Sequence, residues 1–341
     1  MVNMTSPFRK LSVKSSEEII DKAFRRAFRR PITAPKKLKG IDRLKYVERV
    51  RVEIVGSIAA AELEKVYKSF PDLSSIHPFY QQLADIIAGI GRLRHCLGAA
   101  KWAELTVRKI TREYMSRITL SSEKSTIISL RREATGRIAS VLSDISEELS
   151  DLKKYASELR SLPSIDPDTP TIVVAGYPNT GKSTLVGKLS TAEPEVAYYP
   201  FTTRSLILGH MLLHNTKVQL VDTPGMLDRP PSRMKKMELQ ALAALKSLAD
   251  IVVFMIDPSE TCGYQVRKQL HLLEEISSHM DKPTIVALNK MDLADHIPKL
   301  EEKASKAEAA LKEAYKVVRI SAEAGIGLDH LLKLIEHMLF S

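Results

Sequence analysis

The chain carries a glycine-rich segment whose residue types and spacing leave little structural freedom. Gly176 and Gly181 enclose four residues, and Lys182 and Ser183 follow directly. An apolar run over residues 171–175 precedes the segment, and a helix-compatible stretch follows it. Glycines let the backbone curl until successive N–H groups point at a phosphate, and the following helix adds the positive end of its dipole. The segment therefore predicts a phosphate-binding loop between a buried strand and a helix.

The side chains of this loop have separate expected tasks. Lys182 can neutralise the β- and γ-phosphates, and Ser183 offers a hard oxygen ligand for Mg²⁺. Alone, the loop indicates a nucleoside triphosphate without identifying the base. The predicted nucleotide-binding residues here are Gly176, Tyr177, Pro178, Asn179, Thr180, Gly181, Lys182, Ser183 and Thr184.

Three later segments, each after an expected strand, identify the nucleotide as GTP. Asp222 is placed to hold the Mg²⁺ shell, and the Gly225 N–H can sense the γ-phosphate. The Asp292 carboxylate can accept two hydrogen bonds from guanine N1–H and its exocyclic amine, a donor pair that adenine lacks. Asn289 can bond the N7/O6 edge, and Lys290 can lie along the base. In residues 321–323, a backbone N–H can meet guanine O6. The predicted residues of the three segments are Asp222, Thr223, Pro224, Gly225, Asn289, Lys290, Asp292, Ser321, Ala322 and Glu323.

A threonine between the phosphate loop and Asp222 is expected to complete the metal site. A Mg²⁺ switch needs a mobile threonine that joins the metal only when the γ-phosphate is present. Thr203 is the predicted residue and Thr202 the alternative. The expected Mg²⁺ ligands are Ser183, Thr203 and Asp222, and the expected catalytic residues are Lys182, Thr203, Gly225 and Asn179.

The residue after Gly225 predicts slow hydrolysis. A Gln there orients the attacking water in Ras-type proteins, and Met226 cannot do so. GTPases that recruit K⁺ often have an asparagine at the fourth place of the phosphate loop and a hydrophobic residue after the Asp-x-x-Gly motif. Asn179 and Met226 occupy these two places here. K⁺-stimulated turnover with Asn179 as the ligand is therefore a hypothesis. The alternative is that Asn179 only braces the loop.

Strands and helices alternate after residue 170, which predicts an α/β Ras-like G domain with a mainly parallel sheet covered on both faces. The sequence 214–217 between two strands predicts one antiparallel hairpin. The expected strands are 171–175, 206–213, 218–221, 251–256, 284–288 and 317–320, and the expected helices begin near residues 181, 234, 264, 298 and 328.

The first half predicts an all-α bundle. Apolar residues from Val47 to Ala61 recur every three or four positions, on one helix face. A second long helix is expected after Arg131, with a heptad stripe from Ile138 to Leu159. That stripe suits either a partner helix or a seam inside the bundle. The expected division is a basic helical domain over 1–162, a proline-rich linker over 163–170 and a G domain over 171–341.

Charge is concentrated at the start of the chain. The net charge is +10, and residues 1–51 hold 15 basic against 5 acidic side chains. Such a surface attracts polyanions through counterion release, and anionic membranes as well. Two cysteines cannot build a disulfide framework, and we expect both to pack in the core. No apolar run approaches the roughly 20 residues that span a bilayer, so no transmembrane segment is expected.

Further segments resemble one family of GTPases. Phe70–Tyr80, the run 162–167 leading into the phosphate loop, Tyr199–Thr203 and Asp257–Gly263 are similar to the Nog family (nucleolar GTP-binding proteins) in the Obg-like branch. The resemblance implies a role in assembling the large ribosomal subunit, with rRNA contacted by the helical domain. Ribosomal proteins or assembly factors are the implied further partners. Because the chain stops at Ser341, it looks like a short archaeal form, and cytoplasm is the expected location, with the nucleolus only in a eukaryote.

Two other functions fit parts of the sequence. A membrane-associated GTPase would use Phe24 and Phe28 with the surrounding arginines as an amphipathic basic helix. A GTPase linked to tRNA modification would need a separate catalytic group, which the sequence does not offer. Tyr80 and Trp102 are expected in the core, and His77 and His210 are expected to be structural.

Overall fold

The protein forms two compact units in a computed structural model that describes residues 6–197, 199 and 205–340. One unit is helical and contains residues 7–76 and 87–160. The other contains a sheet and is built from residues 161–340 together with Ser6 and residues 77–86. The division near residue 160 falls beside the expected linker. The sequence suggested two consecutive domains, whereas residues 77–86 of the first half belong to the unit with the sheet.

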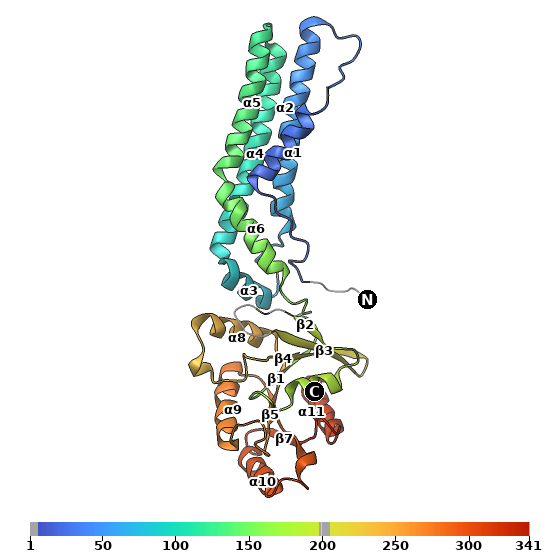
Figure 1. The fold of residues 1–341 in the computed structure, drawn as a ribbon, viewed down its shortest axis with the longest axis vertical. Coiled ribbons are helices and arrows are strands. Elements are labelled where there is room, and N and C mark those ends of the chain that lie inside the picture. Colours follow the sequence, from blue (N-terminus) through green and yellow to red (C-terminus); the bar gives the residue numbers. More distant parts are fainter. Residues whose placement is uncertain (1–5, 198, 200–204, 341) are drawn as a thin grey trace. The chain divides into compact units, whose positions relative to one another are not determined.

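Long helices dominate the helical unit (Figure 1). Helices α2, α4 and α5 pack against one another, and α1 packs on α2 and α5. Apolar side chains face inward along each of them, as the three- and four-residue spacing predicts. The helices are α1 (Ser16–Phe28), α2 (Gly40–Ser69), α4 (Ile90–Leu120), α5 (Lys124–Asp144) and α6 (Ser146–Arg160).

Two expectations about this unit were wrong in detail. The stripe from Ile138 to Leu159 is buried throughout, but the predicted single helix is interrupted at Ile145, whose φ of −107° and ψ of 20° leave the helical region. The stripe therefore belongs to two helices, α5 and α6, that pack within one bundle. Trp102 on α4 is 52% exposed and does not belong to the core.

Gly56 sets the spacing between α2 and α4. A Cβ atom at this position would overlap the Thr111 side chain. Thr111 is itself buried on α4, and its hydroxyl donates to the carbonyl of Val107 at 2.7 Å. The two longest helices of the unit therefore approach through a position that has no room for a side chain.

Residues of helix α3 (Pro78–Ala88) contact Ile165 and Tyr199 of the sheet unit. The Tyr80 hydroxyl donates to the Ile165 carbonyl at 2.7 Å and accepts from the Ile165 N–H at 3.1 Å. The Phe79 ring stacks on Tyr199, with ring centroids 6.4 Å apart and planes inclined by 25°. Both aromatic rings are buried. His77 accepts a hydrogen bond from the Phe79 N–H at 3.2 Å, which is a structural role as expected.

The sheet unit has the predicted mainly parallel sheet. Its strand order is β2-β3-β4-β1-β5-β6-β7. Strands β1, β4, β5, β6 and β7 run parallel, while β3 pairs antiparallel with both β2 and β4. The strands are β1 (Thr171–Ala175), β2 (Glu195–Ala197), β3 (Leu206–Leu213), β4 (Thr216–Asp222), β5 (Ile251–Ile256), β6 (Thr284–Leu288) and β7 (Lys316–Arg319).

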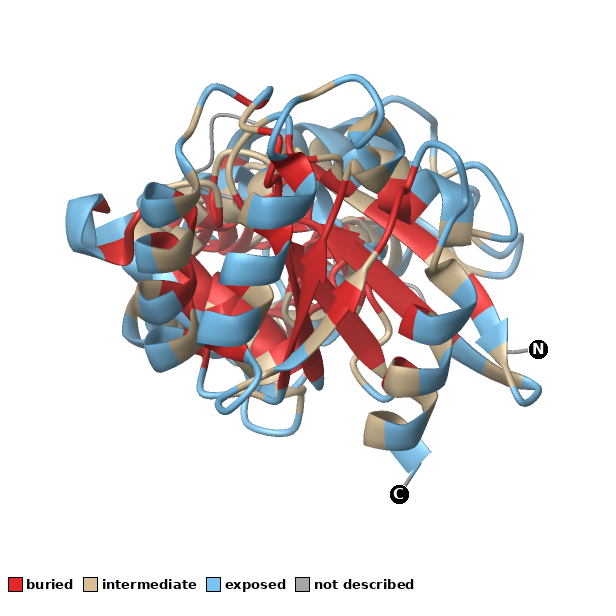
Figure 2. Cartoon of the chain, turned by 90° about the horizontal axis from the view of Figure 1, so that it is seen from below, coloured by how far each residue is buried: buried red, intermediate tan, exposed pale blue. Residues whose placement is uncertain are grey.

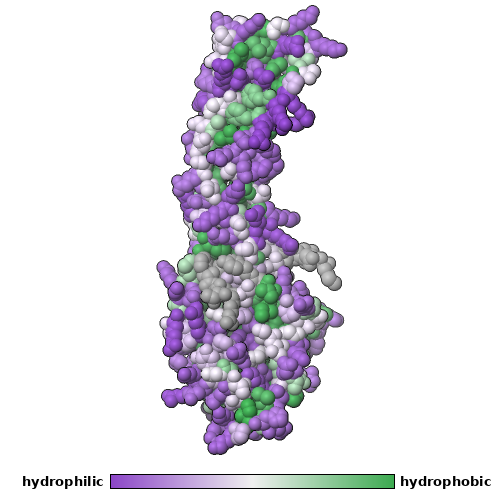
Figure 3. All heavy atoms as spheres, viewed as in Figure 1, coloured by the Kyte–Doolittle hydropathy of each residue, from purple (hydrophilic) through white to green (hydrophobic). Residues whose placement is uncertain are grey.

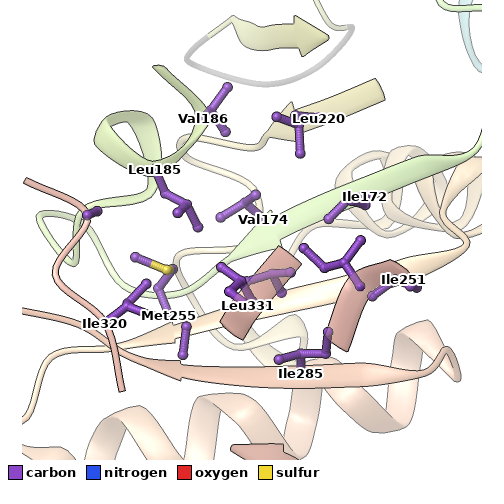
Figure 4. Close-up of a cluster of buried hydrophobic side chains, with 14 of the residues drawn as sticks. Ile172, Val174, Leu185, Val186, Leu220, Ile251, Met255, Ile285, Ile320 and Leu331 are labelled. Carbon is purple, nitrogen blue, oxygen red and sulfur yellow. The ribbon is translucent and has the colours of Figure 1, made fainter. Parts of the chain in front are cut away.

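Helices cover both faces of this sheet, and Figure 2 shows the buried strands enclosed by helices with exposed outer sides. On one face, side chains of β1, β4, β5 and β6 interlock with Leu185 of α7 and Leu331 of α11 (Figure 4). The α-helices are α7 (Lys182–Leu189), α8 (Lys236–Leu248), α9 (Val266–Met280), α10 (Leu300–Leu311) and α11 (Leu328–Phe340), with 3₁₀ turns η1 (Pro231–Arg233) and η2 (Met291–Leu293). No described helix is long and apolar enough to span a membrane.

The predicted strands and the β3–β4 hairpin are confirmed, and five predicted helix starts lie within two residues of the observed ones. The short strand β2 was not predicted. Both cysteines, Cys96 and Cys262, are buried, and burial raises the pKa of each thiol.

We expect the substitution Gly56→Ala to destabilise the helical unit by about 1–3 kcal/mol, the usual cost of overpacking a close contact. The measurement is urea unfolding followed by the fluorescence of Trp102, the single tryptophan, which lies in this unit. The matched control is Gly136→Ala on α5, where a Cβ meets nothing within 4 Å. That change should stabilise the unit by about 0.5–1 kcal/mol. Equal effects of the two substitutions would contradict the close-approach argument.

Candidate functional site

The carboxyl ends of five parallel strands bring the predicted loops to one edge of the sheet. The phosphate loop follows β1, and the loop that begins at Asp222 follows β4. Asp257 follows β5, Asn289 follows β6 and Ser321 lies just beyond β7. In open parallel sheets, ligands bind at this edge. Segments that lie far apart in the sequence therefore form one candidate site.

The phosphate loop has the strained backbone that its glycines allow. Gly176 has φ +136° and Gly181 has φ +100°, both outside the region that other residues adopt readily. A Cβ on Gly176 would press on the Met255 carbonyl, and one on Gly181 would overlap the Asn289 amide. Neighbouring strands β5 and β6 therefore enclose the loop, and only glycine fits at either position.

Lys182 is buried at the first turn of α7. Its Nζ donates to the carbonyls of Gly176 and Tyr177, each at 2.9 Å. The ammonium group thus lies inside the curl of the loop, where the loop carbonyls orient it. A cation held in this way beside a helix N-terminus suits an anionic ligand.

Asp222 and Ser183 fit the expected magnesium site. Ser183 Oγ donates to Asp222 Oδ2 at 2.6 Å, so two hard oxygen donors from α7 and β4 lie together. The other oxygen, Asp222 Oδ1, is buried without a hydrogen-bond partner among the described residues. Burial raises the pKa of Asp222, against the hydrogen bond from Ser183 and the charge of Lys182. A buried carboxylate oxygen without a donor is stabilised by a cation, so the residues fit Mg²⁺.

The Gly225 N–H, predicted to sense the γ-phosphate, has a partner within its own loop. It donates to Asp228 Oδ2 at 2.9 Å. Met226 is 2% exposed and its side chain packs in the core. A buried thioether cannot orient the attacking water, so the side chain of Met226 does not replace the Gln of Ras-type proteins.

Asn289 holds three loops together. Its Nδ2 donates to the Thr180 carbonyl of the phosphate loop at 2.8 Å, and its Oδ1 accepts from the Ala322 N–H at 2.8 Å. The side chain is 2% exposed. Both ends of the amide thus brace the site, and each keeps one further hydrogen-bonding position, so the expected contact with the guanine N7/O6 edge stays a prediction. The Ala322 N–H is likewise engaged by Asn289.

A small cavity of about 150 Å³ lies where the base was expected. It lies between the phosphate loop, the turn η2 and the loop after β7. Asp292 on η2 and Lys290 just before it both line the cavity. Its lining residues are Gly181, Thr184, Asn289, Lys290, Asp292, Leu293, Ser321, Ala322 and Glu323.

Two further predicted residues, Asn179 and Thr223, lie in the loops of the phosphate side. Thr203 and its alternative Thr202 lie outside the described residues. Asn179 is exposed at the tip of the phosphate loop in the left-handed conformation, with φ +62°. Thr223 is buried, and its hydroxyl donates to the Val174 carbonyl at 3.1 Å.

Sequence reasoning did not assign a role to Asp257, Asp228 or Tyr264. Asp257 is fully buried and forms an ion pair with Lys290. The Tyr264 ring stacks on Tyr177 of the phosphate loop, with centroids 3.9 Å apart. The sequence did contain a signal for Asp257, because this aspartate stands at the end of an apolar run, as Asp222 does.

Both halves of the chain match known families. Residues 8–166 match the NOG1 N-terminal helical domain, and residues 171–290 match the family described as 50S ribosome-binding GTPase. An uncharacterized protein of Methanocaldococcus jannaschii is 37% identical over 297 residues, which cover 86% of this chain and 83% of that protein.

Nucleolar GTP-binding proteins are similar over the same region. Nucleolar GTP-binding protein 1 of Arabidopsis thaliana is 33% identical over 82% of this chain and 42% of its own length. That of Caenorhabditis elegans is 30% identical over 94% of this chain and 47% of its own length. The chain thus spans about half the length of these nucleolar relatives. With both domains matched in order, the chain belongs to the NOG1 family of GTP-binding proteins.

Proposed function

We propose that the protein is a slow GTP-hydrolysing switch that binds rRNA during assembly of the large ribosomal subunit. The observation that carries the GTP part is the convergence of the loops after β1, β4, β6 and β7. Asn289 joins the loops after β1, β6 and β7, and the Ser183–Asp222 hydrogen bond connects β4 to the helix after the phosphate loop. The relatives named nucleolar GTP-binding protein support the assembly role.

We also propose the division into a helical domain over 1–162, a linker over 163–170 and a G domain over 171–341. The proposed location is the cytoplasm.

Each residue of the site has a role in this proposal. Lys182 and the loop N–H groups bind the phosphates, and Asp292 with Lys290 binds the guanine. Ser183, Asp222 and Thr203 would hold Mg²⁺, which neutralises charge on the β- and γ-phosphates when bound. Asn289 and Ala322 fix the loops that surround the base, and both line the cavity proposed for it, where Asn289 can also bond the N7/O6 edge. Met226 itself cannot orient the attacking water, which accounts for the proposed slow rate.

The helical unit supports the rRNA part through arginines that remain without acidic partners. Arg26, Arg29 and Arg30, on α1 and just beyond its end, make no ion pair with any described residue, whereas Arg25 pairs with Asp21 at 2.9 Å. These arginines line a groove of about 770 Å³ along α1, together with Lys22, Arg25, Glu18, Asp21 and Ile58 of α2. Figure 3 shows hydrophilic residues over much of the visible surface of this unit. A groove with three unpaired arginines suits a chain of phosphates.

The experiment is co-sedimentation of the full chain with large-subunit precursors, loaded with GDP or with a non-hydrolysable GTP analogue. We expect association with the analogue and release with GDP. The triple substitution of Arg26, Arg29 and Arg30 by Gln should weaken rRNA binding and lower the slope of log affinity against log salt by about 2–3, roughly one for each phosphate that is no longer neutralised.

Arg25→Gln is the matched control, since it removes an arginine of the same helix whose charge Asp21 already neutralises. It should change the salt slope by less than about 1. Vesicles containing anionic lipid form a second arm. Binding to vesicles with no preference for rRNA would favour the membrane-associated alternative and contradict the assembly role.

We also propose that K⁺ stimulates hydrolysis through Asn179. The exposed Asn179 side chain at the loop tip supports this, since its carbonyl is accessible to an ion near the phosphates. The rate of GTP hydrolysis should rise about tenfold or more when KCl replaces NaCl at equal ionic strength, within the range known for added positive charge at phosphoryl transfer. Asn179→Ala should abolish the difference between the two salts. Equal rates in KCl and NaCl would leave Asn179 with only its bracing role.

We expect Asp228 to favour the GDP-bound state over the GTP-bound state. Its carboxylate holds the Gly225 N–H, and that bond must break before the N–H can meet a γ-phosphate. Asp228→Asn replaces a charged acceptor by a weaker neutral one, so affinity for a GTP analogue should rise about three- to tenfold. Affinity for GDP is the internal control and should stay within about twofold. Calorimetric titration measures both, and a parallel change in the two affinities would refute the competition.

A further inference from the structure

We infer that Asp257, at the end of β5, is a positioning residue that holds the Lys290 side chain in place for the guanine ring. The inference rests on the base-binding role proposed above for Lys290. It assigns a task to the loop over residues 257–264, which lies beside the nucleotide loops without matching a nucleotide-binding motif.

The Asp257 carboxylate is fully buried and surrounded by donors. Its Oδ2 accepts from Lys290 Nζ at 2.8 Å, from the Cys262 N–H at 2.8 Å and from the Thr261 hydroxyl at 3.1 Å. Its Oδ1 accepts from the Ser259 N–H at 2.9 Å and from the Ser259 hydroxyl. Burial favours the neutral acid, but the hydrogen bonds from Lys290 and Ser259 outweigh burial and lower the pKa of Asp257. The group is therefore a charged acceptor whose bonding capacity is used fully within the protein.

Lys290 is held at two points. Its Nζ also donates to the Thr261 hydroxyl at 2.8 Å, so both partners come from the loop after β5. Its backbone adopts the left-handed conformation, with φ +66°, directly before the turn that carries Asp292. A free lysine side chain samples many rotamers, and ordering it costs up to about 2 kcal/mol. Because Asp257 fixes the ammonium group, this ordering precedes nucleotide binding, and the aliphatic stem is already beside the base cavity.

The loop that supplies these contacts is itself anchored. The Gln269 side chain of α9 accepts from the Asp257 N–H at 2.7 Å and donates to the Tyr264 carbonyl at 2.8 Å. Tyr264 in turn stacks on Tyr177, with planes inclined by 18°. The loop thus connects the guanine side of the site, through Lys290, with the phosphate loop, through Tyr177.

A simpler interpretation is that the Asp257–Lys290 pair only stabilises the fold. Partly buried ion pairs are weak indicators of net stability, so this interpretation needs a direct test. The two interpretations differ in one respect. A positioning residue acts on GDP only through Lys290, whereas a structural residue acts whether or not Lys290 is present.

The test is a double-mutant cycle on the full chain, with the dissociation rate of fluorescently labelled GDP as the readout. We expect Asp257→Asn to speed GDP release about tenfold, as for loss of a charge-assisted hydrogen bond. Lys290→Ala should speed it at least as much. The double variant should release GDP no faster than Lys290→Ala alone, because the two residues act as a unit.

Glu260→Gln is the matched control. Glu260 lies in the same loop and pairs with Lys303 at 2.6 Å, but it does not touch Lys290. Its GDP release should stay within about twofold of wild type, as expected for a partly exposed ion pair that does not contact Lys290. If Asp257→Asn does not fold, Thr261→Val takes its place. Thr261 is exposed, and the change removes the second acceptor of Lys290, so release should speed up about threefold.

The outcomes separate this inference from the proposed function. If wild type binds GDP and Lys290→Ala weakens binding, but Asp257→Asn and Thr261→Val do not, the positioning role is wrong and the guanine site stands. If the effects of Asp257→Asn and Lys290→Ala multiply independently, Asp257 is a structural residue. If Lys290→Ala has no effect, the proposed role of Lys290 itself fails.

Discussion

The site depends on two hydrogen bonds of one buried side chain. Asn289 joins the Thr180 carbonyl of the phosphate loop to the Ala322 N–H of the loop after β7. No regular ladder links these described loops at that point, because each has already left its strand. An unpaired amide buried at this position would cost about 1–3 kcal/mol, so all three loops must hold their positions together. Gly181 has to be glycine for the same reason, since a Cβ there would overlap this amide.

Much of this arrangement could be predicted, because strand register does most of the placement. Apolar runs of four to eight residues with polar or glycine-rich ends indicated the strands, and parallel pairing then puts all their carboxyl ends at one edge. What could not be predicted is which atoms a polar side chain bonds. The motif with Asn289 suggested a contact with the base and gave no sign that the same side chain also braces the loops. The break at Ile145 was hidden because a heptad stripe can continue across two consecutive helices.

The helical unit shows why charge counts alone say little about a binding surface. Lys14, Lys22 and Lys65 surround the buried carboxylate of Glu62. Burial favours protonation of Glu62, yet Lys14 and Lys22 lower its pKa to about 2. Arg51 and Arg131 both pair with the buried Glu48 and lie over the Phe28 ring. These cations neutralise buried carboxylates, so their charge is not available to a polyanion in the way that the exposed charges of Arg26, Arg29 and Arg30 are.

Two buried aspartates at neighbouring strand ends illustrate how surroundings divide roles between identical groups. Asp222 is the last residue of β4, Asp257 directly follows β5, and both are fully buried. Asp257 receives donors at both oxygens and has a lowered pKa, so its charge is compensated within the chain. Asp222 keeps one oxygen without a donor among the described residues and has a raised pKa. A carboxylate whose charge the protein leaves uncompensated is stabilised by an external cation, whereas a compensated one fixes its neighbours. The same residue type thus serves the metal in one loop and the shape of the site in the next.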